Sequence, residues 1–287
     1  MTNVPKLITQ LSVMLICSSA PLFATVVFDL NDVVLDGGIG ENTFITRNSA
    51  SDGGLVYNGG TPSLTYSLNA ANGYSYFSSN FDAQSLSNVG DGIEVSYSFT
   101  PTGAGTFKNQ ENAFRVGFYD SKGTLVTSDS TSSGQSAFND DKGYMALYSP
   151  RMATQPSDEF YQRTGSNNNL WTSSTRTAVS GSPDLTSPST GAVTGLFRVE
   201  LISPTSIQLT SQINGSASQS IVDLSGLETS FDMVSFFAMS GGGSQSLTFD
   251  EMTVTVIPEP SSLVLIMGAA GLFLISGVRR RSLKSRK

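Results

Sequence analysis

The central part of the chain alternates between apolar and polar residues over short stretches, with clusters of Gly, Asn, Asp, Ser and Pro between them. Residues 93–99 read Ile-Glu-Val-Ser-Tyr-Ser-Phe, and residues 114–119 read Phe-Arg-Val-Gly-Phe-Tyr ahead of an Asp-Ser-Lys-Gly turn. Successive side chains of a strand point to opposite faces, so each stretch predicts a strand with one buried face. Further strands are predicted at 144–148, 197–202, 207–213, 220–224, 233–239 and 247–256.

Short strands separated by turn residues predict an all-β fold, an antiparallel sandwich or barrel. Residues 25–256 form one predicted β-sandwich domain, because no linker-like change of composition divides them. Residues 128–192 are rich in Ser, Thr, Asn, Gly and Pro, which predicts long loops.

The order of elements near the end of this domain narrows the fold class. Residues 197–201 turn through Ser-Pro-Thr into residues 207–212, an Ile-Asn-Gly turn follows, and residues 247–254 supply a closing strand. This arrangement resembles the concanavalin-like, laminin-G-type jelly roll, which implies that the hairpin belongs to the last third of the sandwich. An immunoglobulin-like sandwich has a similar pattern and stays open as an alternative.

The beginning of the chain has the layout of a secretory signal peptide. Residues 1–24 contain Lys6, an apolar run over 7–16 and small residues up to Ala24, where we expect signal peptidase to cut. We therefore expect export, through a predicted signal helix. The only cysteine, Cys17, lies inside this segment. The mature chain then contains no disulfide, thiolate metal site or cysteine nucleophile.

The end of the chain, residues 257–287, has three parts. A box of Pro258, Glu259 and Pro260 predicts an extended hinge, because two prolines so close together can continue neither a strand nor a helix. Residues 261–278 carry no charge and predict a transmembrane helix about 27 Å long. A basic cluster follows and favours a cytoplasmic end. It begins with Arg279, Arg280 and Arg281.

This three-part ending resembles the PEP-CTERM sorting signal of bacterial exported proteins. The resemblance implies that an exosortase-type membrane protease reads Pro258, Glu259 and Pro260 and then releases or transfers the body. It also implies a protein of the cell envelope, outer surface or extracellular space that is transiently anchored in the inner membrane. The alternative is an ordinary C-terminal anchor with an incidental Pro-Glu-Pro.

Charge and composition exclude several classes of function. Residues 25–257 contain nine Lys and Arg against 22 Asp and Glu, a net charge of −13, which argues against nucleic-acid binding. The chain has no histidine, which removes the catalytic triads and imidazole zinc sites.

Paired carboxylates could still hydrolyse glycosides. We expect adjacent acidic residues on a strand to point to opposite faces, so we predict no enzyme and rank a glycosidase last among the alternatives. The adjacent pairs are Asp140-Asp141, Asp158-Glu159 and Asp250-Glu251.

A structural calcium ion is the one cofactor that the sequence suggests. Asp29, near the first strand, and Asp250, in the last, would lie close together if these two strands pair, and carboxylate oxygens are calcium ligands. The alternative is that both are solvated carboxylates at strand ends. No EF-hand loop is present.

The single tryptophan, Trp171, lies in the loop-rich stretch near Tyr161 and Asn168. An exposed aromatic ring beside amides would bind sugar, whereas a buried core position is the alternative for a tryptophan. The sequence favours a structural protein of the envelope or extracellular matrix. A carbohydrate-binding, lectin-like module that binds extracellular polysaccharide is the alternative function.

Overall fold

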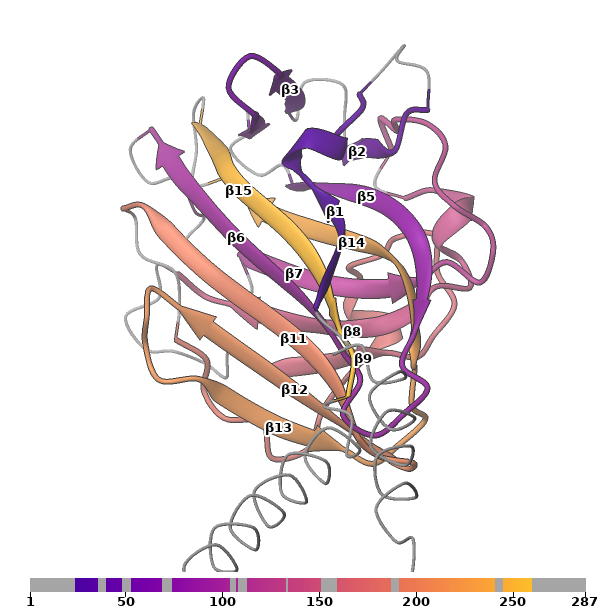
Figure 1. Ribbon diagram of the computed structural model, residues 1–287. Helices are drawn as coiled ribbons and strands as arrows, with labels where there is room; N and C mark the ends of the chain where they lie inside the picture. Colours follow the sequence, from indigo (N-terminus) through magenta and orange to yellow (C-terminus); the bar gives the residue numbers. More distant parts are fainter. Residues whose placement is uncertain are drawn as a thin grey trace, which may run out of the picture. The chain divides into compact units, whose positions relative to one another are not determined.

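The computed structural model describes residues 24–35, 40–47, 53–68, 74–103, 107, 113–132, 134–150, 159–186, 191–240 and 245–259. Residues 24–257 form one compact unit, in which two β-sheets pack face to face (Figure 1). Three short 3-10 helices accompany the strands: η1 Leu30–Asp32, η2 Ser136–Phe138 and η3 Ser173–Thr175. The strands are β1 Thr25–Asp29, β2 Thr43–Arg47, β3 Gly54–Asn58, β4 Ser63–Leu68, β5 Tyr74–Ser85, β6 Gly92–Thr102, β7 Phe114–Asp120, β8 Lys142–Tyr148, β9 Phe160–Arg163, β10 Arg176–Ala178, β11 Val193–Ser203, β12 Ser206–Ile213, β13 Gln219–Asp223, β14 Ser230–Met239 and β15 Gln245–Ile257.

Both sheets are antiparallel, which confirms the predicted antiparallel β-sandwich. The eight-stranded sheet has the order β13-β12-β11-β6-β15-β4-β3, and β1 pairs with β15 beside this path. The seven-stranded sheet has the order β10-β9-β8-β7-β14-β5-β2. Many neighbours in space are far apart in sequence, so the last strand, β15, lies in the interior of its sheet between β6 and β4.

Aromatic rings from both sheets fill the space between them. The ring centroid of Phe249 on β15 lies 5.1 Å from those of Phe99 and Phe236, which come from the two different sheets. Tyr97 meets Phe236 edge to face at 5.2 Å. Such edge and tilted contacts add to the stability gained from area burial, and they hold the two layers in one relative position.

The outer face of the seven-stranded sheet is also buried. All seven residues of β7 are buried, because the segments 121–141 and 164–175 lie over the face that points away from the first core. These segments contribute Phe138 and Trp171 to a second apolar cluster that also holds Tyr119 and Phe237. The molecule therefore has a third, irregular layer made of loops.

The predicted strands of the second half of the domain are confirmed. The predicted hairpin is β11 and β12, whose register runs from Gly195 opposite Ile213 to Ser203 opposite Ser206. The sequence analysis did not identify β2 to β5. The prediction of long loops over 128–192 is partly wrong, because β9 and β10 lie there. Strand β9 is buried on both faces and shows no alternation of apolar and polar residues, and β10 is only three residues long.

The predicted signal segment 1–24 and the predicted tail 257–287 lie outside the described residues, apart from Ala24 and residues 257–259. Within the described part of the chain, no helix has the length and apolar character to cross a membrane. The predicted signal helix and membrane helix therefore stay predictions.

Candidate functional site

A hollow of about 490 Å³ lies where β1, η1, the start of β2, the middle of β5 and the segment 125–127 meet. We call it the acidic pocket. Its lining combines carboxylate, amide and hydroxyl groups with apolar side chains. The polar residues are Asp32, Glu41, Asn42, Asn80, Asp82 and Thr127, and the apolar residues include Phe28, Phe81 and Leu125.

A capping box holds Asp32 at the rim of the acidic pocket. The backbone N–H of Asn31 donates to Asp29 Oδ1 at 2.6 Å, and the backbone N–H of Asp29 donates to Asp32 Oδ2 at 2.8 Å. The two carboxylates thus satisfy N–H groups that the short helix η1 cannot pair internally. Buried Leu30 anchors the same turn in the core.

Two amide side chains tie the walls of the acidic pocket together. Asn42 accepts from the backbone N–H of Val34 at 3.0 Å and donates to the carbonyl of Asp32 at 2.7 Å. Asn80 Nδ2 donates to the carbonyl of Val126 at 2.8 Å. Asn80 Oδ1 is buried and has no hydrogen-bond partner within the described residues.

The acidic pocket is rich in hydrogen-bond acceptors, and none of the described residues that line it is Lys or Arg. The side chain of Asp82 on β5 is exposed, and its carboxylate accepts no hydrogen bond from any of the described residues. Asp82 therefore offers two free carboxylate oxygens beside the apolar surface of Phe81 and Leu125. This combination suits a ligand with hydroxyl donors and apolar C–H faces.

The first and last strands pair, as the calcium hypothesis requires, but their carboxylates do not form a set of calcium ligands. Strands β1 and β15 do pair, with Asp29 opposite Thr253. The carboxylate of Asp29 is committed to the cap of η1, and Asp250 lies in a bulge where the register of β15 shifts. Within the described ranges, no group of three acidic, His or Cys side chains is placed to hold a metal ion.

The prediction that adjacent acidic residues point to opposite faces is wrong for Asp250 and Glu251. Both side chains are exposed. The reason is a β-bulge: Phe249 pairs with Phe99 and Glu251 with Ser98, so one extra residue interrupts the alternation. Both carboxylates therefore face solvent on the outer side of the eight-stranded sheet.

Trp171 is in the second apolar cluster and is 3% exposed. Its ring meets Tyr119 edge to face at 5.6 Å, which corresponds to the core position that we considered as the alternative. Tyr161 is half-buried beneath the guanidinium of Arg176, 5.0 Å away, and Asn168 is exposed. These three residues do not form an open aromatic platform, and a ligand role for them stays a prediction.

Arg163 on β9 fastens the loop layer to the sheet. This side chain is 1% exposed, and its nitrogens lie 2.6–3.0 Å from five backbone carbonyl oxygens and one hydroxyl oxygen. Arginine has five N–H groups, so at least one of them is shared between two acceptors. The positively charged guanidinium group thus hydrogen-bonds the carbonyl oxygens that converge here, in the way that a bound cation would coordinate them. The acceptors are the carbonyls of Phe138, Asp141, Asn167, Asn169 and Leu170 and Oγ1 of Thr175.

Asp141, close to Arg163, is a buried carboxylate without hydrogen bonds in the described structure. It is 1% exposed, and neither carboxylate oxygen has a hydrogen-bond partner in the described structure. Burial raises its pKa to about 8, the nearby charge of Arg163 opposes this rise, and Asp232 and Asp120 add to it. Asp140 is exposed, but this pair lies in the turn before β8 and not on a strand, so it does not test the predicted alternation; Asp158 lies outside the described residues.

The sequence analysis missed the residues of the acidic pocket and the buried arginines. The Asp-Leu-Asn-Asp sequence at 29–32 is a capping-box signal that could have located the turn at the rim. Nothing in the sequence indicates that Asn80 and Asp82 on β5 meet this turn. Of the predicted sorting motif, Pro258 and Glu259 directly follow β15, whereas Pro260, Arg279, Arg280 and Arg281 lie outside the described residues.

No protein-family model and no curated protein sequence matches the chain. Among solved structures, peanut lectin with a nine-residue peptide is 12% identical, with a TM-score of 0.45, over 82% of this chain and 98% of that one. Winged bean acidic lectin with methyl-α-D-galactose is 7% identical, with a TM-score of 0.44, over the same shares of the two chains. A carbohydrate esterase from the Shiga toxin-encoding bacteriophage phi24B is 13% identical, with a TM-score of 0.39, over 82% and 99%. At this similarity no residue role passes from these proteins to this chain.

Proposed function

We propose that the body of this protein is a carbohydrate-binding module and that the acidic pocket is its sugar site. The observation that carries the proposal is the lining of this hollow, in which carboxylates and amides surround an apolar floor. Its volume of about 490 Å³ lies within the range of about 300–1,000 Å³ that is typical of small-molecule sites. A sugar ring presents hydroxyl donors at its edge and C–H groups on its faces, which match these two kinds of surface.

The proposed contacts follow from the hydrogen bonds already made. Asn42 is committed to the protein backbone and shapes the wall, whereas the carboxylate of Asp82 is an exposed acceptor. Sugar hydroxyls would donate to the two oxygens of Asp82 while the ring covers Phe81 and Leu125. Binding without catalysis is proposed.

The test uses the full-length chain, purified in a detergent without sugar groups, on a glycan array and in polysaccharide pull-downs. We expect saturable binding to at least one glycan and a loss of about tenfold or more in affinity for Asp82→Asn, because this change removes the charge of an open acceptor. Asp184→Asn is the matched control, since Asp184 is exposed outside the acidic pocket. If the folded wild-type chain binds no glycan, the structural envelope protein becomes the better interpretation.

The same proposal includes export and sorting to the cell envelope, with signal peptidase and an exosortase-type enzyme as partners. The positions of the strands support it. A cut after Ala24 leaves all of β1 in the mature chain, and processing at the Pro-Glu-Pro box leaves all of β15, which ends at Ile257. Both predicted cuts thus spare every strand of the sandwich.

A further inference from the structure

A bulge in β5 exposes Asp82 at the acidic pocket. The register of β5 on β14 shifts here, so that residues 81–83 stand opposite a single residue, Asp232. The extra residues interrupt the alternation of the strand, and Asp82 and its neighbour Ala83 are both exposed. Bulges are common beside functional sites, where they redirect one side chain. The redirected group in this strand is a carboxylate that lines a hollow.

Three carboxylates line the acidic pocket, and they come from different elements of the fold. Asp82 comes from β5, Asp32 from η1 and Glu41 from the residues before β2. Asp32 is exposed, like Asp82, and the capping box holds it at the rim. Among the described residues, neither Asp32 nor Asp82 takes part in an ion pair. Their negative charges therefore act on a ligand that enters the hollow.

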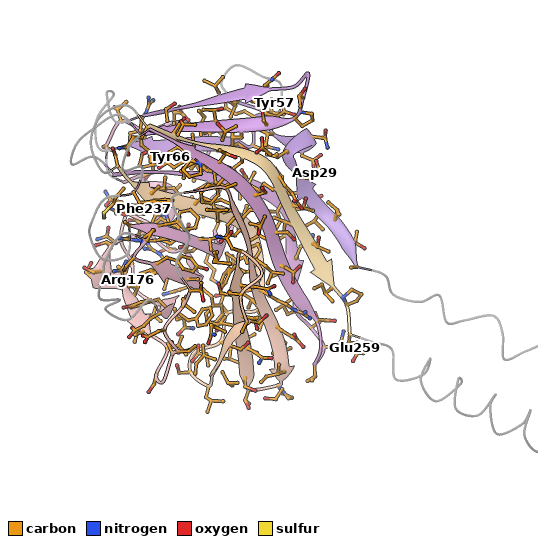
Figure 2. All side chains as sticks on the ribbon, turned by 90° about the vertical axis from the view of Figure 1, so that its left-hand side faces the viewer. Asp29, Tyr57, Tyr66, Arg176, Phe237 and Glu259 are labelled. Atoms are coloured by element: carbon orange, nitrogen blue, oxygen red, sulfur yellow. The ribbon has the colours of Figure 1, made fainter. Side chains whose placement is uncertain are left out.

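The positive charge of the domain is gathered in a different place. Three of the nine Lys and Arg residues within 25–257 lie around Tyr119, on strands β7, β9 and β10 under the loop layer. They are Arg115, Arg163 and Arg176. Figure 2 shows Arg176 on one side of the molecule and Asp29, next to the acidic pocket, on the other. This separation favours a negative potential at the acidic pocket.

The carboxylates of the acidic pocket are not arranged around a single point. Asp32, Glu41 and Asp82 line the same hollow, yet within the described ranges no group of three acidic, His or Cys side chains is placed to hold a metal ion. Phe81 and Leu125 belong to the same lining, and Leu125 is 41% exposed. An apolar surface does not stabilise a bare metal ion, but it can cover the C–H groups of an organic cation. The lining thus favours a larger ligand that carries positive charge.

We infer that the acidic pocket selects sugars that carry a protonated amine, that is, hexosamine units whose amino group is not acetylated. This inference rests on the proposed function of the acidic pocket. An ammonium group brings three N–H donors and a charge, and it forms short, charge-assisted hydrogen bonds with carboxylates. The ring itself lies on the apolar floor of the pocket. Uronic acids carry a carboxylate, so the same negative potential repels them.

The test is a calorimetric titration of the full-length chain, in a detergent without sugar groups, with three kinds of short oligosaccharide. They are oligomers of glucosamine, of N-acetylglucosamine and of galacturonic acid, used at about pH 6, where an amine of the α-amino type carries its proton. We expect the glucosamine oligomer to bind about tenfold or more tightly than the acetylated one, as is typical of a charged hydrogen bond, and the acidic oligomer to bind most weakly.

Ionic strength provides a second readout of the same preference. Raising it from about 0.1 M to about 1 M shortens the Debye length from about 10 Å to 3 Å. The advantage of the glucosamine oligomer over the acetylated one should therefore shrink severalfold, because the carboxylates that cause it line an open hollow. An advantage that does not change with salt would contradict an electrostatic origin.

Two variants test whether the carboxylates cause the preference. Asp82→Asn should weaken binding of the glucosamine oligomer more than binding of the acetylated one, so that the ratio of the two affinities falls to about threefold or less. Asp32→Asn keeps an oxygen for the N–H of Asp29, which preserves the cap, and it should lower the same ratio severalfold. Asp250→Asn is the matched control, because Asp250 is exposed on the outer side of the eight-stranded sheet, and it should leave the ratio unchanged.

The outcomes separate this inference from the proposed function. If the folded wild-type chain binds no glycan at all, both fail. If it binds other glycans but not the glucosamine oligomer, or binds the acetylated or acidic oligomer equally tightly, the acidic pocket stays a sugar site and only the selection of amines is overturned. Equal losses for both oligomers in Asp82→Asn would also overturn it, because the carboxylate would then act only as an acceptor for hydroxyls.

Discussion

At the scale of single residues, Arg163 and Asp141 show how the loop layer is held. Arg163 donates to carbonyls from both covering segments, so one buried side chain joins Phe138 and Leu170 to the sheet. Its carbonyl partners are dipoles, and the carboxylate of Asp141 is left without hydrogen bonds. A buried carboxylate in this state favours protonation, because the charged form has lost its hydration.

Asp141 should therefore make the stability of the protein depend on pH. The pKa of this carboxyl is about 8 in the folded protein and near 3.8 when unperturbed, so the folded state binds the proton more tightly than the unfolded chain does. The stability that this proton contributes is fully present below about pH 4 and is lost as the pH rises through about 8. Thermal or urea unfolding of wild type and Asp141→Asn from pH 4 to pH 9 measures this contribution.

Asn has nearly the same shape as Asp and no ionisation, so Asp141→Asn should be more stable than wild type by about 2 kcal/mol or more at pH 8 and about equal at pH 4. The neighbouring exposed residue provides the control, since Asp140→Asn should change little at any pH. A stability difference between wild type and Asp141→Asn that does not vary with pH would show that Asp141 is ionised in the folded protein throughout this range.

At the scale of elements, turns and bulges decide where side chains point. The β12–β13 hairpin turns at Asn214 and Gly215, which both have positive φ, and the N–H of Ser216 donates to the carbonyl of Ile213 at 2.9 Å. An Asn-Gly turn of this kind matches the twist of the flanking strands. The bulge in β15 interrupts the regular alternation of side chains, because it turns both Asp250 and Glu251 to solvent.

The turn leads to a prediction about Gly215. Gly215→Ala should lower the free energy of unfolding by about 1 kcal/mol, because φ is +68° there and an L residue is strained in that region. Gly54→Ala on β3 is the matched control: an added Cβ meets nothing within 4 Å at either position, and only Gly215 has a positive φ. Denaturant unfolding of both variants checks this, and an equal effect would mean that backbone strain is not the cause.

At the scale of the whole molecule, the two ends of the sandwich meet in one ladder. Thr25 pairs with Val256 on adjacent strands, although the two residues are separated by nearly the whole domain in sequence. The predicted cleavage sites flank this ladder directly. If both are used, the mature protein is the complete sandwich and carries neither hydrophobic segment.

Processing of the tail gives the prediction at this scale. Replacing Pro258, Glu259 and Pro260 by alanine in the native host should leave the chain at its larger mass and in the membrane fraction, whereas the wild type is found at the smaller mass outside it. Immunoblots of fractionated cells measure both properties. Glu251→Gln is the control, because Glu251 is an exposed carboxylate in the same strand. Unchanged processing of the triple variant would identify the tail as an ordinary anchor.

Prediction from sequence was best where one face of a strand is buried and the other is open. The strands β6, β11, β12 and β15 alternate in this way, and their positions were confirmed. The strand β9 was missed because the loop layer buries it on both faces, which removes the alternation. The role of Trp171 stayed undecided for the same reason, since only the folded layer shows whether a loop residue is covered.

The sequence by itself determined the all-β class, the positions of half-buried strands and the acidic character of the body, because these depend on local composition and on a period of two residues. Only the tertiary structure decided which strands are neighbours, which carboxylates gather in the acidic pocket and which arginines meet under the loop layer. Asp32 and Asp82 belong to η1 and β5, and Arg115 meets Trp171 across 56 positions of the chain. Such contacts result from strand order and packing between distant segments, which no local pattern of residues specifies.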